Sequence, residues 1–173
     1  MKLLLENWRE YLNEAENSPK DILKNWEHKD AANYAQELID RYEEPDEFSE
    51  SQMTWRNISQ FDETTVKDES IPHNFPKPHH DFVYSTIEIE VPEELVSVFA
   101  HATESILVDR LKNTVTARCG DINANTITIG FVQDVISNKV SQEPEEAKKE
   151  YARRIIEGDL PDWFKENTDE THT

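Results

Sequence analysis

The sequence predicts an α+β fold: a small antiparallel or mixed sheet in the order strand, helix, strand, strand, helix, preceded by two or three amphipathic helices. Apolar and polar side chains alternate from Phe82 to Val91, which indicates a strand with one face in water. Apolar residues recur at helical spacing before residue 44 and again after Pro92, which indicates amphipathic helices. A chain of 173 residues fits one domain of ordinary size with extensions.

The elements after the first strand complete this order. Pro92 begins a helix that we expect to extend to about Lys112, because the apolar residues between them form one broad face. Residues 114–119 and 126–131 are rich in β-forming side chains. The turn-forming residues 120–125 separate them, so the two segments predict a hairpin.

A last helix is expected over residues 144–157, with Gly158 at its carboxyl end. Its apolar residues also recur at helical spacing. We therefore place the α+β domain at residues 79–165. The polar residues 166–173 are expected to form a tail.

Helices are also expected at the N-terminus. Residues 1–16 form an amphipathic pattern that includes Trp8, and this helix needs a surface to pack against. Residues 17–44 form a second helical segment, in which Ser18 precedes a proline as a helix cap does. Pro45 is expected to end this segment.

Residues 45–78 are expected to form an acidic linker or long loop. Their apolar residues are sparse and show no period, and prolines cluster at the end. Residues 37–72 contain eleven acidic side chains against three basic ones, a local charge of −8. Such a composition is typical of a segment that cannot bury enough apolar surface to fold.

The net charge restricts the partners of the protein. Thirty-seven acidic residues against eighteen basic ones give a net charge of −19, which repels phosphate backbones and anionic lipid. We therefore expect no direct nucleic-acid binding and no membrane attachment. A protein partner with a basic surface is the natural complement, and the open edge of a small sheet could support a homo-oligomer.

We expect that the protein is not secreted through a signal peptide. It has no apolar run long enough to cross a bilayer, and the apolar residues 3–5 are too few for a signal-peptide core. Cys119 is the only cysteine, so no internal disulfide can form, and we expect it to be a small buried apolar residue. These features favour a cytoplasmic or virion-internal protein.

The N-terminus resembles a known class of leader. Residues 1–15, Met-Lys-Leu-Leu-Leu-Glu-Asn-Trp-Arg-Glu-Tyr-Leu-Asn-Glu-Ala, are similar to the capsid-targeting leader of internal head proteins of large tailed phages. The resemblance implies that a head-maturation protease cleaves after Leu12-Asn13-Glu14, before Ala15. It covers about 15 of the 173 residues, and residues 16–173 resemble no family.

A histidine-rich segment before the first strand is the candidate metal site. His73, His79, His80 and Asp81 could together bind zinc or another divalent ion. In an extended chain His79 and Asp81 point to the same side and His80 to the opposite side, so only some of them can share one ion. Either His73 or His101 would then have to complete the site. The alternative is that these residues are solvated polar side chains of a proline-rich loop without any cofactor.

Three functions are compatible with these patterns. The first is a non-catalytic acidic accessory or interaction protein, phage-encoded or virion-internal. The second is an acidic mimic of nucleic acid that blocks a basic host protein. The third is a metal-dependent hydrolase that uses the segment from His73 to Asp81, with Glu88 and Glu90 on one strand face. We expect no catalytic residues, since no nucleophile motif or glycine-rich phosphate loop is present.

Overall fold

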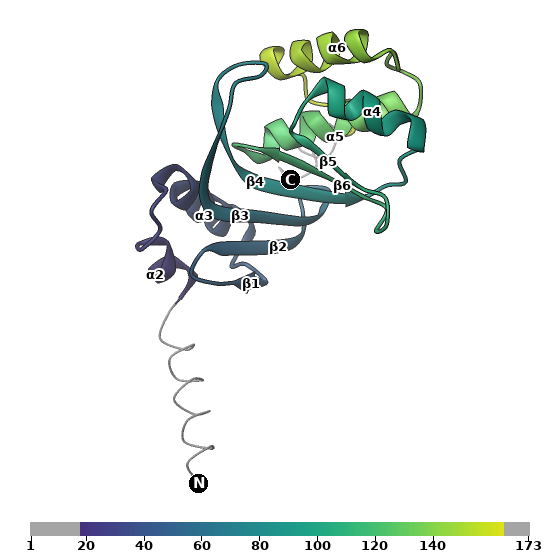
Figure 1. Cartoon of the computed structure of the whole chain (residues 1–173). Coiled ribbons are helices and arrows are strands. Elements are labelled where there is room, and N and C mark those ends of the chain that lie inside the picture. The colour runs from purple at the N-terminus through teal and green to yellow at the C-terminus, as the bar shows by residue number, and fades with distance from the viewer. Residues whose placement is uncertain (1–17, 165–173) are drawn as a thin grey trace.

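The computed structural model describes residues 18–164, and these form an α+β fold around one antiparallel sheet (Figure 1). The six strands lie in the order β1-β2-β3-β4-β6-β5. Every neighbouring pair is antiparallel. The bounds of the strands are β1 Glu47–Phe48, β2 Gln52–Ile58, β3 Phe61–His73, β4 His79–Glu88, β5 Ile106–Asp109 and β6 Thr114–Cys119.

The helices form two groups against the sheet. α4, α5 and α6 lie together at the end that carries β4, β6 and β5, and α2 and α3 lie beside β1 to β3 (Figure 1). Their bounds are α2 Pro19–Leu23, α3 Lys29–Tyr42, α4 Glu93–Ala102, α5 Ile122–Ile136 and α6 Pro144–Glu157. Tyr34 of α3 connects the two groups, since its hydroxyl accepts a hydrogen bond from the Ile122 amide at 2.7 Å.

The core is built from rows of side chains that cross the sheet. Met53, Val66, Val83 and Cys119 are successive cross-strand partners on β2, β3, β4 and β6, and all four are buried. Alternate positions of a strand face the same side, so this row lies on one face of the sheet. α5 covers this face, because the Asn125 amide donates to the Val83 carbonyl at 3.2 Å.

The prediction of an acidic linker over residues 45–78 is wrong, because β1, β2 and β3 occupy most of it. Trp55 and Val66 are fully buried there, while most of the acidic side chains are at least partly exposed. A two-residue turn joins β2 to β3, and its residues Ser59 and Gln60 both have positive φ. Asn-Gly or Asp-Gly is the usual sequence of such a turn, so Ser-Gln gave no hairpin signal.

Two predicted elements of the second half are also wrong. Residues 126–131 are helical and belong to α5, so the hairpin partner of β6 is β5 and not this segment. α5 is buried nearly all round, so it shows no amphipathic period, and its β-branched residues resembled a strand. The predicted helix over 92–112 ends at Ala102. Leu111, one of the apolar residues expected on the buried face of that helix, is 99% exposed in the β5–β6 turn.

Other expectations are confirmed. The strand over 114–119 and the helix over 144–157 have the predicted bounds, and Gly158 ends α6 with positive φ. Cys119 is buried, as expected. None of the helices between residues 18 and 164 has the length and apolar character needed to span a bilayer.

Three sequence assignments lie outside the described residues. They are the helix or leader over 1–16, the cleavage residues Leu12, Glu14 and Ala15, and the tail over 166–173. The leader resemblance therefore stays a prediction.

Candidate metal centre

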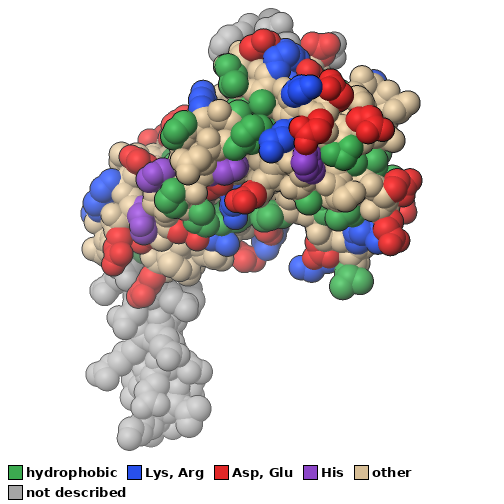
Figure 2. Space-filling model, turned by 45° about the horizontal axis from the view of Figure 1, so that its top comes forward, with side chains coloured by type: hydrophobic (Ala, Val, Ile, Leu, Met, Phe, Trp, Pro, Cys, Tyr) green, Lys and Arg blue, Asp and Glu red, His purple; other side chains and the backbone are tan. Residues whose placement is uncertain are grey.

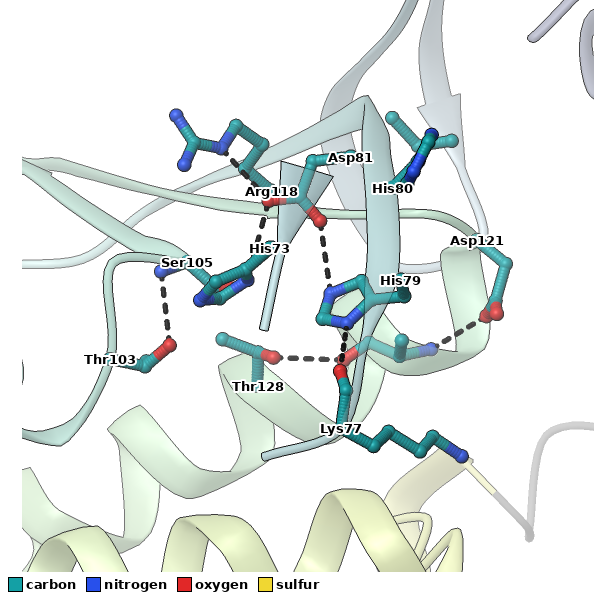
Figure 3. A network of polar contacts seen from close by, with 12 residues as sticks. His73, Lys77, His79, His80, Asp81, Thr103, Ser105, Arg118, Asp121 and Thr128 are labelled. Atoms are coloured by element: carbon teal, nitrogen blue, oxygen red, sulfur yellow. Dashed lines mark hydrogen bonds and ion pairs between the residues drawn. The ribbon is translucent and has the colours of Figure 1, made fainter. Parts of the chain in front are cut away.

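The β3–β4 hairpin brings three of the four predicted ligands together (Figure 3). His73 ends β3 and is the cross-strand partner of His79, the first residue of β4. Asp81 follows two residues later, on the same side of the strand as His79. One ligand atom from each of the three side chains lies within 4.8 Å of the other two. The chain reverses between the two strands over residues 74–78, so the proline-rich segment is the turn that pairs the histidines.

The imidazole of His79 is oriented by the backbone. Its Nδ1 lies 2.8 Å from the carbonyl oxygen of Lys77, and a carbonyl can only accept. Nδ1 therefore carries the proton, and in the neutral imidazole Nε2 carries the lone pair. This Nε2 is buried and lies 3.0 Å from Oδ1 of Asp81, but the two atoms do not meet hydrogen-bond geometry.

Asp81 is fully buried, and its two oxygens have different surroundings. Oδ2 accepts a hydrogen bond from Nε of Arg118 at 3.2 Å and lies 3.4 Å from Nδ1 of His73. Oδ1 has no hydrogen-bond partner within the described part of the chain. Arg118 thus compensates the charge of the carboxylate and leaves one of its oxygens directed at His79 (Figure 3).

His73 is held in a neutral state. Only 6% of the residue is exposed, and burial lowers the pKa of its imidazole despite the nearby charge of Asp81. Nδ1 lies 3.2 Å from the hydroxyl of Ser105, which is also fully buried. Ser105 and Asp81 both approach the same nitrogen, whereas a Ser-His-Asp triad needs one partner on each ring nitrogen. The cluster is therefore not a hydrolytic triad.

His80, the fourth predicted ligand, does not belong to the cluster. It points to the opposite side of β4, where its exposed imidazole contacts the hydroxyl of Ser70 (Figure 3). This correction follows from strand alternation, which separates neighbouring residues. His101 is also elsewhere, because its Nε2 lies 2.7 Å from the carboxylate of Glu145 on α6.

The three side chains offer the donors that a divalent transition metal prefers. Two imidazoles and one carboxylate form known zinc sites and also the facial triad of non-haem iron. Ligand atoms of a tetrahedral zinc lie about 3.3 Å apart, given bond lengths of about 2.0–2.2 Å. Nε2 of His79 and Oδ1 of Asp81 are only slightly closer, at 3.0 Å. The carbonyl behind His79 and the guanidinium behind Asp81 are outer partners of the kind that orient metal ligands.

Two cavities lie beside the cluster. One of about 420 Å³ is lined by His73, the end of α4 and Lys148 of α6. The other, of about 240 Å³, is lined by His79, Cys119 and the start of α5. Burial raises the pKa of the Cys119 thiol to about 12, so it stays protonated at neutral pH and is a poor ligand or nucleophile.

The other proposed acid–base residues are not assembled. Glu88 and Glu90 are outside the cluster, at the opposite end of β4 and just after it. Tyr84, which lies on the same side of β4 as Glu88, donates its hydroxyl hydrogen to Glu69, and burial together with this contact raises the pKa of Tyr84 to about 12. Sequence reasoning missed Arg118 and Ser105, since neither stands in a motif with the histidines.

Comparisons with known proteins add no relative: no family model, no curated protein and no solved structure matches this chain.

Proposed function

We propose that this protein binds one divalent transition-metal ion, with zinc as the first candidate, through His73, His79 and Asp81. One observation carries the proposal. Nε2 of His79 and Oδ1 of Asp81 are both buried and lie 3.0 Å apart, and neither has a hydrogen-bond partner among residues 18–164. Buried polar atoms are nearly always paired, so these two atoms are expected to bind a cation that accepts a lone pair from each of them.

The electrostatics support a metal ion over a bridging proton. A second proton on His79 would satisfy the charge of Asp81, but Arg118 already compensates this carboxylate. A shared proton also requires hydrogen-bond geometry between donor and acceptor, which the two atoms do not meet. A metal ion accepts ligands from different directions and has no such requirement.

The donor set favours zinc or a neighbouring transition metal over magnesium or calcium. Those two hard ions take oxygen ligands, whereas two of the three donors here are imidazole nitrogens. Three protein ligands would leave a position for water, whose pKa zinc lowers to about 7. The reaction class that such a centre would support is metal-assisted hydrolysis.

Equilibrium dialysis of chelator-treated protein against zinc, followed by metal analysis, tests the proposal. We expect one ion per chain in the wild type and a loss of at least about tenfold in affinity for Asp81→Asn and for His79→Gln. His80→Gln is the matched control, since its imidazole lies beside Ser70 outside the cluster. Equal zinc binding by all four proteins would refute the proposal.

A second candidate is the acidic interaction protein, favoured by the net charge of −19. On the face drawn in Figure 2, Asp and Glu side chains are interspersed with basic and apolar ones, which supports a general protein contact more than a row of phosphate-like charges. Association with a purified basic protein should weaken steeply with salt if this role holds. If the protein does not bind the basic protein at low ionic strength, the role as an acidic interaction protein is excluded.

A virion-internal location has its own test. Mass spectrometry of the protein from mature particles should find a chain that begins at Ala15. An intact N-terminus there would remove the processing hypothesis.

A further inference from the structure

The larger cavity beside the metal cluster lies where three elements meet. His73 and Phe75 contribute from the end of β3 and the turn after it, Thr103 and Glu104 from the segment after α4, and Lys148 from α6. The cavity has a volume of about 420 Å³, which fits a small molecule. Since His73 lines it, a ligand in this cavity would stand next to a metal ion held by the cluster.

The charges around the cluster determine which charge a ligand in this cavity must have. Imidazoles bind metal ions in their neutral form, and Arg118 compensates the single negative charge of Asp81. The two positive charges of a divalent ion would therefore remain uncompensated by the protein. Burial strengthens this field, because the surrounding dielectric is low.

Lys148 adds a cation to the same cavity. Its Nζ lies 5.1 Å from the ring centroid of Phe75, which orients the side chain over the turn. Within residues 18–164 no carboxylate forms an ion pair with Lys148. Glu104 also lines the cavity and cancels one charge, so the cavity with its metal stays positive.

The smaller cavity is less suited to an anion. It adjoins the N-terminus of α5, where free amide groups would attract negative charge. However, the Ile122 amide donates to Tyr34 at 2.7 Å, and the Ala124 amide donates to the side chain of Asp121 at 2.8 Å. The carboxylate of Asp121 occupies the position that an anion would take.

We infer that the larger cavity, once the cluster holds its metal ion, binds a small oxyanion, with one oxygen on the metal and Lys148 balancing the charge. The inference rests on the proposed metal site. It names the substrate class as molecules that carry a carboxylate or a phosphate-type group. An oxyanion is the chemistry that a positively charged, partly open metal position and a lysine both recognise.

Cobalt(II) provides a test with separate outcomes for the two proposals. The chelator-treated protein is loaded with cobalt, and its visible absorption spectrum is recorded during titration with acetate and, separately, with methylphosphonate. Cobalt loading should produce ligand-field bands, and at least one of the two anions should shift them saturably. Absence of the bands contradicts the metal site itself. Bands that neither anion shifts contradict only the inferred oxyanion site.

Two lysine variants locate the anion. Lys148→Gln should weaken the anion-induced shift about five- to tenfold without changing the cobalt bands, since one charge contact is lost. Lys149→Gln is the matched control, because this neighbouring lysine pairs with Glu146 at 2.9 Å and lines a different cavity. Equal anion affinity in both variants would overturn the assignment to this cavity.

Discussion

His79 and Asp81 stand two residues apart on β4, and Nε2 of the histidine lies 3.0 Å from Oδ1 of the aspartate without a hydrogen bond between them. A hydrogen bond to another residue orients each of these side chains: Nδ1 of His79 donates to the Lys77 carbonyl, and Oδ2 of Asp81 accepts from Arg118. Two buried acceptors held this close repel each other unless a cation lies between them. The central claim of a metal site depends on this relationship.

Asp68 tests whether the acidic segment is folded. Its carboxylate accepts the amide hydrogens of Glu27 at 3.0 Å and His28 at 2.9 Å, so it ties β3 to the start of α3. Burial disfavours the charge of Asp68, but these bonds outweigh it and lower its pKa. Asp68→Ala should reduce the free energy of unfolding by about 2 kcal/mol in denaturant titrations. Glu50→Ala, at an exposed position, should change it by less than about 0.5 kcal/mol.

Phe131 tests the assignment of residues 126–131 to a buried helix. Its ring is fully buried and meets Tyr151 at 5.4 Å and Phe99 at 6.3 Å between centroids. Phe131→Ala should reduce the free energy of unfolding by about 3–5 kcal/mol, measured by thermal and chemical denaturation. Ile156→Ala serves as the control, because Ile156 is 60% exposed and its truncation should have little effect. Similar losses at both positions would contradict the packing of α5.

Glu150 should make the stability depend on acid pH. Hydrogen bonds from Arg153, with a smaller contribution from Arg154, lower its pKa from 4.5 to about 2. Since the folded-state pKa is depressed, the stabilisation is complete above about pH 4.5 and is lost as the pH falls toward 2. Glu150→Gln should cost about 1 kcal/mol at pH 7 and flatten the stability profile between these pH values.

Unfolding curves across this pH range provide the measurement. Glu146→Gln is the control, because its carboxylate is more exposed and pairs only with Lys149 among the ion pairs of the described residues. A wild-type profile no steeper than that of Glu150→Gln would contradict the role of Glu150.

The fold class could be predicted from the sequence, but half of the sheet could not. Alternation in β4 and the capped, amphipathic α6 are local signals that tertiary structure left intact. In β2 and β3, Trp55 and Val66 are buried within the sheet and under α3, and the buried residues of these strands come in runs instead of alternating, so no local period records them. Acidic side chains at the exposed positions of these strands made the segment resemble a linker.

The same distinction applies to the candidate site. Strand alternation alone predicted that His79 and Asp81 would share a side and that His80 would not. The choice of His73 over His101 required the register of the hairpin, in which His73 is directly opposite His79. Arg118 enters from β6, 37 residues along the chain from Asp81, so only the assembled sheet identifies it.

A crystal of the protein grown with zinc, with diffraction recorded on both sides of the zinc absorption edge, tests the central claim most directly. We predict one anomalous peak between His73, His79 and Asp81, at about 2.0–2.2 Å from Nε2 of His79 and from Oδ1 of Asp81. The metal site would be contradicted if a crystal saturated with zinc gave no peak at this position while Nε2 of His79 and Oδ1 of Asp81 kept their separation.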